Sequence, residues 1–229
     1  MKGIIIGDGE VGTSLYNVLK EYYPTKIRGE DEPEWTDESC DILHICFPYS
    51  DEFKDEVRRY TKKYNPEFTI IHSTVPVGTS REVKAMHSPI RGKHPKLERS
   101  IREFVKYIGG KKASYVADYF RRADIRVYLF DKPETTELMK ILSTTKYGVD
   151  VEFTQEVKKL CDKFDVPFSA WTHFTDTYNK GYKKQDKGHF NRPNLVPIMK
   201  ELGGHCLSSN AKLLDSKFTK LLQKLNGNI

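Results

Sequence analysis

"GIIIGDGEVGTSLYNVLKEY", residues 3–22, carries the clearest structural pattern of the chain. A short β-branched run is followed by Gly7, Gly9 and Gly12, and then by apolar residues at helical spacing. The apolar positions of this helical stretch are Leu15, Val18, Leu19 and Tyr22. The pattern predicts a strand, a glycine turn and a helix.

A Gly-x-Gly-x-x-Gly motif between a strand and a helix is typical of a dinucleotide-binding turn. Gly7 permits the tight turn, Gly9 lets the backbone reach a pyrophosphate, and Gly12 lets helix and strand pack closely. The alternative is a glycine-rich turn without a ligand. We expect these residues at the cofactor: Gly7, Gly9, Glu10, Val11, Gly12, Glu30, Phe47, Pro48, Ser73 and Thr74.

An acidic residue about 20 positions after the glycines is expected to bond the ribose hydroxyls. Glu30 or Asp31 meets that spacing, and an acid there repels the 2′-phosphate of NADP, so NAD is the favoured cofactor. Arg28 leaves room for NADP.

Strands and helices alternate up to Asp131 and Lys132, and the pattern is helical from Pro133 onward. Continuous apolar runs such as "CDILHICFP" (40–48) and "FTIIHSTVP" (68–76) indicate buried parallel strands. Residues 134–166 predict one helix of about 30 residues. We therefore expect an α/β fold: a Rossmann-type doubly wound parallel sheet over 1–132, followed by a smaller all-helical domain over 133–229.

The composition excludes several classes of protein. The 229 residues carry a formal net charge of +6, without an Arg/Lys block or a nucleic-acid module. That charge favours anionic ligands, or is a solvated basic surface. The apolar runs are too short to span a membrane, and the first strand leaves no room for a signal peptide. The four cysteines are widely spaced, which favours free thiols in the cytoplasm.

Five segments together resemble the UDP-glucose/GDP-mannose dehydrogenase family, in the same order and at similar spacing. They are "MKGIIIGDGEVG", "CDILHICFP", "IIHSTVPVGTS", "ELMKILSTTKYGVDVEFTQEV" and "ELGGHCLSSN". The resemblance implies an NAD-dependent enzyme that oxidises a sugar C6 alcohol to a carboxylate through a cysteine. It also implies a homodimer built on the helical domain. Family members continue into a further nucleotide-sugar-binding domain, so this chain resembles a shortened form.

The resemblance assigns roles to particular residues. Cys206 matches the nucleophile, and Gly203 and Gly204 match the turn that presents it. Lys140 matches the catalytic lysine, and Thr74 the threonine that holds a water or a substrate oxygen.

The chain departs from the family at three positions. Asn210 stands in place of a catalytic aspartate, Thr144 in place of an asparagine, and Ile90 in place of a glutamate. Asparagine cannot accept a proton from water at neutral pH. We therefore expect the substitution to impair the hydrolytic second step of the reaction most.

The segment that follows Ile90 is basic. Arg91, Lys93 and His94 suggest an anionic group on the substrate, or are surface charges beside a turn.

Three hypotheses follow. The leading one is an NAD-dependent dehydrogenase acting on a sugar nucleotide or a related anionic sugar alcohol. The second is an NAD- or sugar-nucleotide-binding protein with reduced or lost activity. The third is a subunit whose missing domain comes from a partner chain. The His and Cys spacing is not typical of a zinc site, so we expect no metal.

Overall fold

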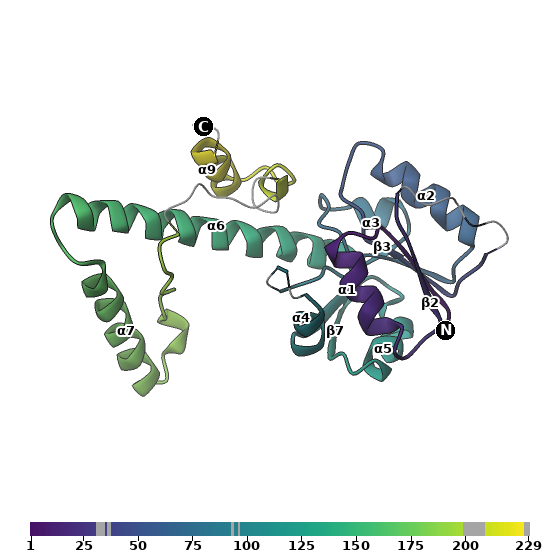
Figure 1. Ribbon diagram of the computed structural model, residues 1–229, viewed down its shortest axis with the longest axis horizontal. Coiled ribbons are helices and arrows are strands. Elements are labelled where there is room, and N and C mark those ends of the chain that lie inside the picture. The colour runs from purple at the N-terminus through teal and green to yellow at the C-terminus, as the bar shows by residue number, and fades with distance from the viewer. Residues whose placement is uncertain (31–34, 36–37, 93, 96, 199–208, 227–229) are drawn as a thin grey trace. The chain divides into compact units, whose positions relative to one another are not determined.

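The computed structural model describes residues 1–30, 35, 38–92, 94–95, 97–198 and 209–226. It divides into two compact units, Met1–Ile141 and Leu142–Ile229 (Figure 1). The long helix α6 (Pro133–Lys163) begins in the first unit and ends in the second. The functional boundary expected near residue 132 remains a prediction.

The first unit is built on a seven-stranded sheet in the order β2-β1-β3-β4-β5-β6-β7. Pairing is parallel from β2 to β5 and again between β6 and β7. The strands are β1 (Gly3–Ile6), β2 (Thr25–Arg28), β3 (Ile42–Ile45), β4 (Phe68–Ile71), β5 (Met86–His87), β6 (Lys106–Gly109) and β7 (Val127–Phe130). The predicted α/β fold is confirmed.

One pairing differs from the expected all-parallel sheet. β6 pairs antiparallel with β5, through His87 and Gly109. The reason is topological, because a parallel neighbour requires a crossover that returns the chain to the opposite edge. Here the connection holds the helix α4 (Leu97–Glu103), and β6 begins at the edge where β5 ends.

Helices cover both faces of the sheet (Figure 1). Alternate residues of β1 divide between two hydrophobic cores, with Ile5 in one and Ile4 and Ile6 in the other. Side chains of α1, α4 and α5 complete the first core, and those of α2 complete the second. The helices are α1 (Glu10–Leu19), α2 (Phe53–Tyr64), α3 (Thr79–Glu82) and α5 (Ala113–Arg122).

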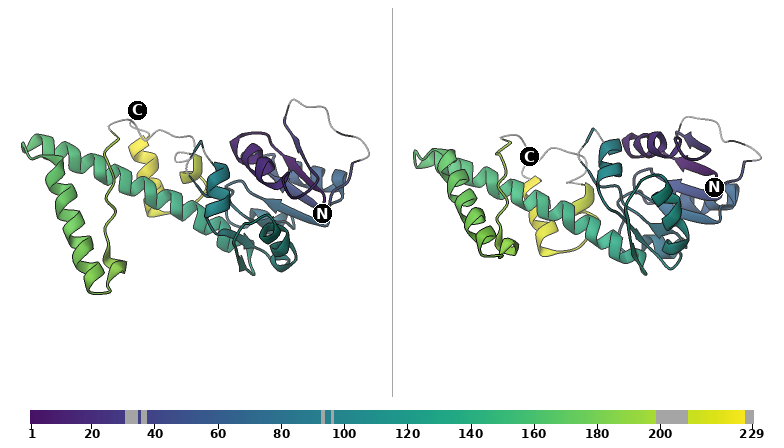
Figure 2. Two further views of the ribbon diagram at one scale, coloured as in Figure 1. Left: turned by 60° about the horizontal axis from the view of Figure 1, so that its bottom comes forward. Right: turned by 90° about the horizontal axis from the view of Figure 1, so that it is seen from below.

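The elements of the second unit are all helices among its described residues, and they are joined by loops (Figure 2). After α6 it contains α7 (Phe168–Lys184), η1 (Gly188–Phe190) and α9 (Lys217–Asn226). Phe153 and Trp171 meet edge to face, with ring centroids 5.9 Å apart, and this contact joins α6 to α7. Nowhere in the described chain is a helix both long and apolar enough to cross a bilayer.

A chain of buried polar groups runs through the first unit. His72 Nδ1 lies 2.7 Å from the Ser88 carbonyl, so Nδ1 carries the proton and Nε2 accepts. His44 Nδ1 donates to that Nε2 over 2.9 Å, and the Tyr119 hydroxyl then donates to His44 Nε2. The two bonds accepted at Nε2 require that both imidazoles are neutral. Burial, together with the nearby Lys106 ammonium, lowers the pKa of His44 to about 3.

Lys106 lies beside this chain and is buried as well. Its Nζ is 3.3 Å from both the Ser88 carbonyl and His72 Nδ1. Burial lowers the pKa of Lys106 to about 7. The native protein therefore releases the Lys106 proton far below the pH at which the unfolded chain does.

This burial predicts a pH-dependent stability. From about pH 7 to about pH 8.5 the unfolded state still holds the Lys106 proton while the native state loses it, so the free energy of unfolding rises with pH. Lys106→Met removes that rise. Urea unfolding across this range measures it, with exposed Lys111→Met as the matched control. A Lys106→Met slope equal to that of the wild type would contradict the assignment.

Candidate functional site

The glycine turn joins β1 to α1 and has little room around it. Gly7 has a φ of +100°, and its N–H donates to the Arg28 carbonyl. A Cβ on Gly7 would lie 2.8 Å from the Phe47 nitrogen and 2.9 Å from the Cys46 carbonyl carbon. Both the backbone angle and the space therefore require glycine at this position.

The other two glycines of the motif differ in their surroundings. A Cβ on Gly12 would lie 1.8 Å from the Gly7 carbonyl oxygen, so α1 packs directly against the turn. A Cβ on Gly9 would have no neighbour within 4 Å. Gly9 thus leaves an open surface at the N-terminus of a ten-residue helix, where backbone N–H groups and the helix dipole favour an anion.

This turn lies where the sheet order reverses. β1 pairs with β2 on one side and with β3 on the other, and ligands of such sheets bind at the carboxyl ends of strands at this point. Phe47 and Pro48 follow β3. The Ser73 hydroxyl, after β4, donates to the Phe47 carbonyl over 2.5 Å. The Phe47 ring itself packs inward on Phe53, with centroids 5.0 Å apart.

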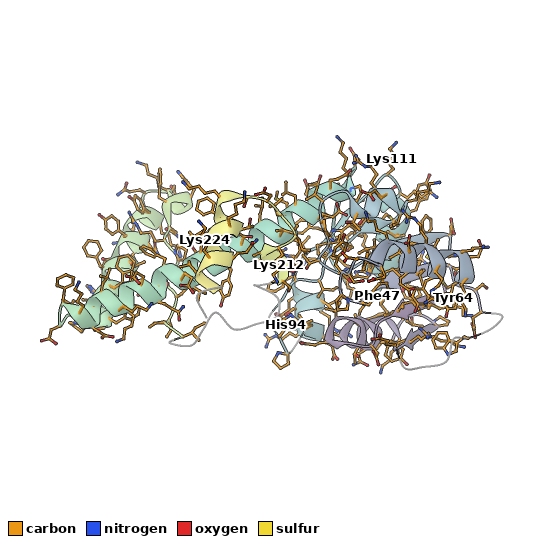
Figure 3. All side chains as sticks on the ribbon, turned by 90° about the horizontal axis from the view of Figure 1, so that it is seen from above. Phe47, Tyr64, His94, Lys111, Lys212 and Lys224 are labelled. Carbon is orange, nitrogen blue, oxygen red and sulfur yellow. The ribbon has the colours of Figure 1, made fainter. Side chains whose placement is uncertain are left out.

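His94 comes to the same turn from a distant part of the sequence. Its Nδ1 lies 2.5 Å from Glu10 Oε2, in the first turn of α1 (Figure 3). Arg91 lies elsewhere: its guanidinium covers the Tyr107 and Phe104 rings at 5.0 and 5.7 Å. The basic segment predicted to bind substrate is therefore divided, and Lys93 lies outside the described residues.

Thr74 is half-buried, in the loop that follows β4. Glu137 of α6 holds this loop. Its fully buried carboxylate accepts hydrogen bonds from the Gly78 and Ser80 N–H groups, at 2.6 and 2.8 Å. Glu137 was not among the residues predicted from the sequence, because its place on a helix with other polar residues does not indicate that it is buried.

The first turns of α6 are bonded to the end of β5. His87 Nδ1 lies 2.8 Å from the Thr136 hydroxyl, and His87 Nε2 lies 3.1 Å from the Ser73 carbonyl. Lys140 Nζ donates to the Ile90 carbonyl over 2.9 Å. Lys140 and Thr74 therefore belong to the same edge of the sheet as the glycine turn.

The remaining predicted catalytic and turn residues lie in the second unit or outside the described residues. Thr144 is half-buried and Asn210 is buried, and both belong to the second unit. Cys206, Gly203 and Gly204 lie outside the described residues. The roles predicted for all five remain predictions. Within the described chain, no three His, Cys, Asp or Glu side chains gather in a way that could hold a metal ion.

Comparison with known proteins supports the resemblance seen in the motifs. No family model matches the sequence. The chain is 25% identical over 226 residues to a UDP-N-acetyl-D-mannosamine dehydrogenase of Methanococcus vannielii, covering 89% of this chain and 46% of that protein. A protein of the same name from Methanococcus maripaludis is 24% identical over 177 residues, covering 70% of this chain and 38% of that protein. The chain thus has homologues among the nucleotide-sugar dehydrogenases and spans less than half of their length.

Solved structures share the fold. UDP-D-ManNAc dehydrogenase from Pyrococcus horikoshii superposes with a TM-score of 0.74 at 17% identity, over 100% of this chain and 68% of that one. The 3-hydroxyisobutyrate dehydrogenase of Mycobacterium tuberculosis gives 0.71 at 12% identity, over 99% and 92%. The Psf3 structure, in complex with NADP+, gives 0.66 at 13% identity, over 100% and 94%.

Two alanine substitutions in the glycine turn should affect different properties, one the stability of the protein and the other its affinity for a dinucleotide. Gly12→Ala forces a Cβ against the Gly7 carbonyl, and we expect it to lower the free energy of unfolding by roughly 1–3 kcal/mol or more. Gly9→Ala meets open space, so stability should change by less than about 1 kcal/mol while binding of a dinucleotide weakens. Urea unfolding and titration calorimetry measure the two effects. Equal destabilisation by both variants would contradict this division.

Proposed function

We propose that this chain is the NAD-binding and part of the catalytic portion of an oxidoreductase acting on a sugar nucleotide or a related anionic sugar alcohol. The open surface at Gly9, at the N-terminus of α1 and on the same edge as Thr74 and Lys140, carries the proposal. The homology to UDP-N-acetyl-D-mannosamine dehydrogenases and the fold shared with dehydrogenases support it.

At the carboxyl edge of the sheet, some residues would bind the cofactor and others would take part in the reaction. The N–H groups at the start of α1 hold the pyrophosphate, and the carboxyl end of β3 at Phe47 and Pro48 borders the site. A bound NAD would supply the acceptor for the hydride that leaves the substrate carbon. The hydroxyl of that carbon loses its proton to solvent as the hydride leaves. Lys140 supplies a positive charge that stabilises the oxygen as it becomes anionic, and Thr74 orients that oxygen.

Cys206 is proposed as the nucleophile for a second oxidation, by resemblance to the family. A thiolate adds to the aldehyde carbon, and the cation at Lys140 favours the thiolate over the thiol. The hydrolysis that would complete this step needs a base, which the amide of Asn210 cannot supply. We therefore propose that the oxidation to the aldehyde is retained and that the hydrolysis that releases the acid from Cys206 is slow. The same substitution favours the second candidate, a binding protein with reduced turnover.

The activity is tested by NADH formation with UDP-N-acetyl-D-mannosamine, UDP-glucose, GDP-mannose and 3-hydroxy acids. Lys140→Met should lower kcat by about 100-fold or more, because an oxyanion-stabilising charge is lost. Lys111→Met, at an exposed lysine in the turn before α5 (Figure 3), should match the wild type. NAD binding without turnover on any substrate would favour the binding protein. Turnover only after addition of a separately supplied nucleotide-binding domain would favour the partner-chain hypothesis.

We also propose a homodimer in the cytoplasm, formed through the helical unit. Large apolar side chains are exposed there, including Phe153, Phe164, Phe174 and Phe218. Cys40 and Cys46 are buried free thiols, which suits a reducing compartment.

The dimer predicts a difference between two equally exposed aromatic residues. Phe164 of the helical unit is 68% exposed and Tyr115 of the sheet unit is 67% exposed. Phe164→Glu should raise the dimer dissociation constant by about tenfold or more, because a charge is placed in an apolar interface, and Tyr115→Glu should leave it unchanged. Light scattering over a dilution series measures both. A monomeric wild type at all concentrations would contradict the dimer.

A further inference from the structure

The residue that directly follows β2, next to the glycine turn, is a glycine, and the predicted acids Glu30 and Asp31 come after it. Gly29 follows β2 directly and is buried, at the carboxyl end of the strand that pairs with β1. It lies 20 residues after Gly9, the spacing at which this fold commonly places an Asp or Glu. Glu30, the next residue, is exposed.

The carboxylate of Asp8 fills the space that a side chain at Gly29 would take. A Cβ on Gly29 would lie 2.4 Å from Asp8 Oδ2, 2.7 Å from Asp8 Cγ and 3.0 Å from Asp8 Oδ1. Asp8 stands between Gly7 and Gly9. The carboxylate in the space beside Gly29 therefore comes from the turn after β1 and not from the end of β2. The Asp8 carbonyl accepts a hydrogen bond from the Thr13 hydroxyl over 2.6 Å, which ties this peptide to α1.

The surroundings of Asp8 suit a ligand hydroxyl. Asp8 is exposed, and no described residue donates a hydrogen bond to its carboxylate. An ionised carboxylate is an acceptor only, and it bonds a pair of hydroxyls but repels a phosphate. Arg28, the nearby cation that could receive a 2′-phosphate, is buried, and its guanidinium donates to the Tyr60 hydroxyl over 2.9 Å.

We infer that Asp8 is the acidic side chain that receives the adenosine ribose hydroxyls of NAD and excludes NADP, in the place usually taken by a residue after β2. This rests on the proposed function, since it deepens the assignment of the same cofactor site.

Relocating the acid tests the inference. Asp8→Ala should weaken NAD binding about tenfold to hundredfold, the equivalent of one charge-assisted hydrogen bond, and reduce the preference over NADP. Gly29→Asp alone should also weaken binding, because two carboxylates then compete for one space. The double variant Asp8→Ala with Gly29→Asp should recover NAD affinity and the preference, because no positive φ opposes a side chain at Gly29. Titration calorimetry with NAD and with NADP measures each.

Further variants keep the test decisive. Asp8→Asn preserves the size of the side chain and should reduce the preference for NAD over NADP even if Gly29→Asp fails to fold. Asp118→Ala, at an exposed acid on α5, is the control and should bind NAD as the wild type does. Urea unfolding checks that Asp8→Ala is as stable as the wild type, so that any loss of affinity belongs to the ligand contact.

The inference about Asp8 and the proposed function would be contradicted by different results. Wild-type NAD affinity in Asp8→Ala rejects Asp8, and a loss confined to Glu30→Gln or to Asp31→Asn assigns the ribose contact to that residue instead. A wild-type protein that binds neither NAD nor NADP rejects the proposed function itself, before any variant is compared.

Discussion

The close approach of α1 to the end of β1 is the constraint on which the site depends. Because the Cα of Gly12 lies against the Gly7 carbonyl, the helix begins directly over the strand and its first N–H groups point to the sheet edge. The same packing brings Gly7 onto the backbone of Cys46 and Phe47, so the ends of β1 and β3 are held together. A small side chain at either glycine would move the helix away and open the anion-binding surface.

The opposite side of the same edge is held by buried polar contacts. Glu137 receives two backbone N–H groups of the loop that carries Thr74, and His87 joins that loop to Thr136. Both contacts come from the first turns of α6, the helix that also carries Lys140. The position of the lysine relative to the loop is thus set within the first unit, by hydrogen bonds whose loss would leave buried groups unsatisfied.

Much of the fold followed from the sequence, because apolar periodicity and the glycine turn are local. The continuous runs around Ile42–Ile45 and Phe68–Ile71 are strands, and the long helix begins at Pro133. The antiparallel pairing of β6 was missed, because strand direction depends on where a connection ends and leaves no mark on a strand's own residues. The separation of Arg91 from His94 was also not predicted. His94 contacts Glu10 and Arg91 contacts Tyr107, and neither contact is visible in the local sequence. Glu137 was missed because a single acid on a helix does not reveal what it accepts.

The shared space of Asp8 and Gly29 has a consequence for how such chains diverge. An acid added at position 29 while Asp8 remains crowds two like charges, and loss of Asp8 while Gly29 remains leaves no carboxylate in the space beside Gly29. If Asp8 has the proposed role, neither single replacement preserves the local arrangement, and we expect the effects of substitutions at the two positions to be coupled. A comparison that treats each position by itself would find an aspartate in one and a glycine in the other, and would not show that the two residues share one space.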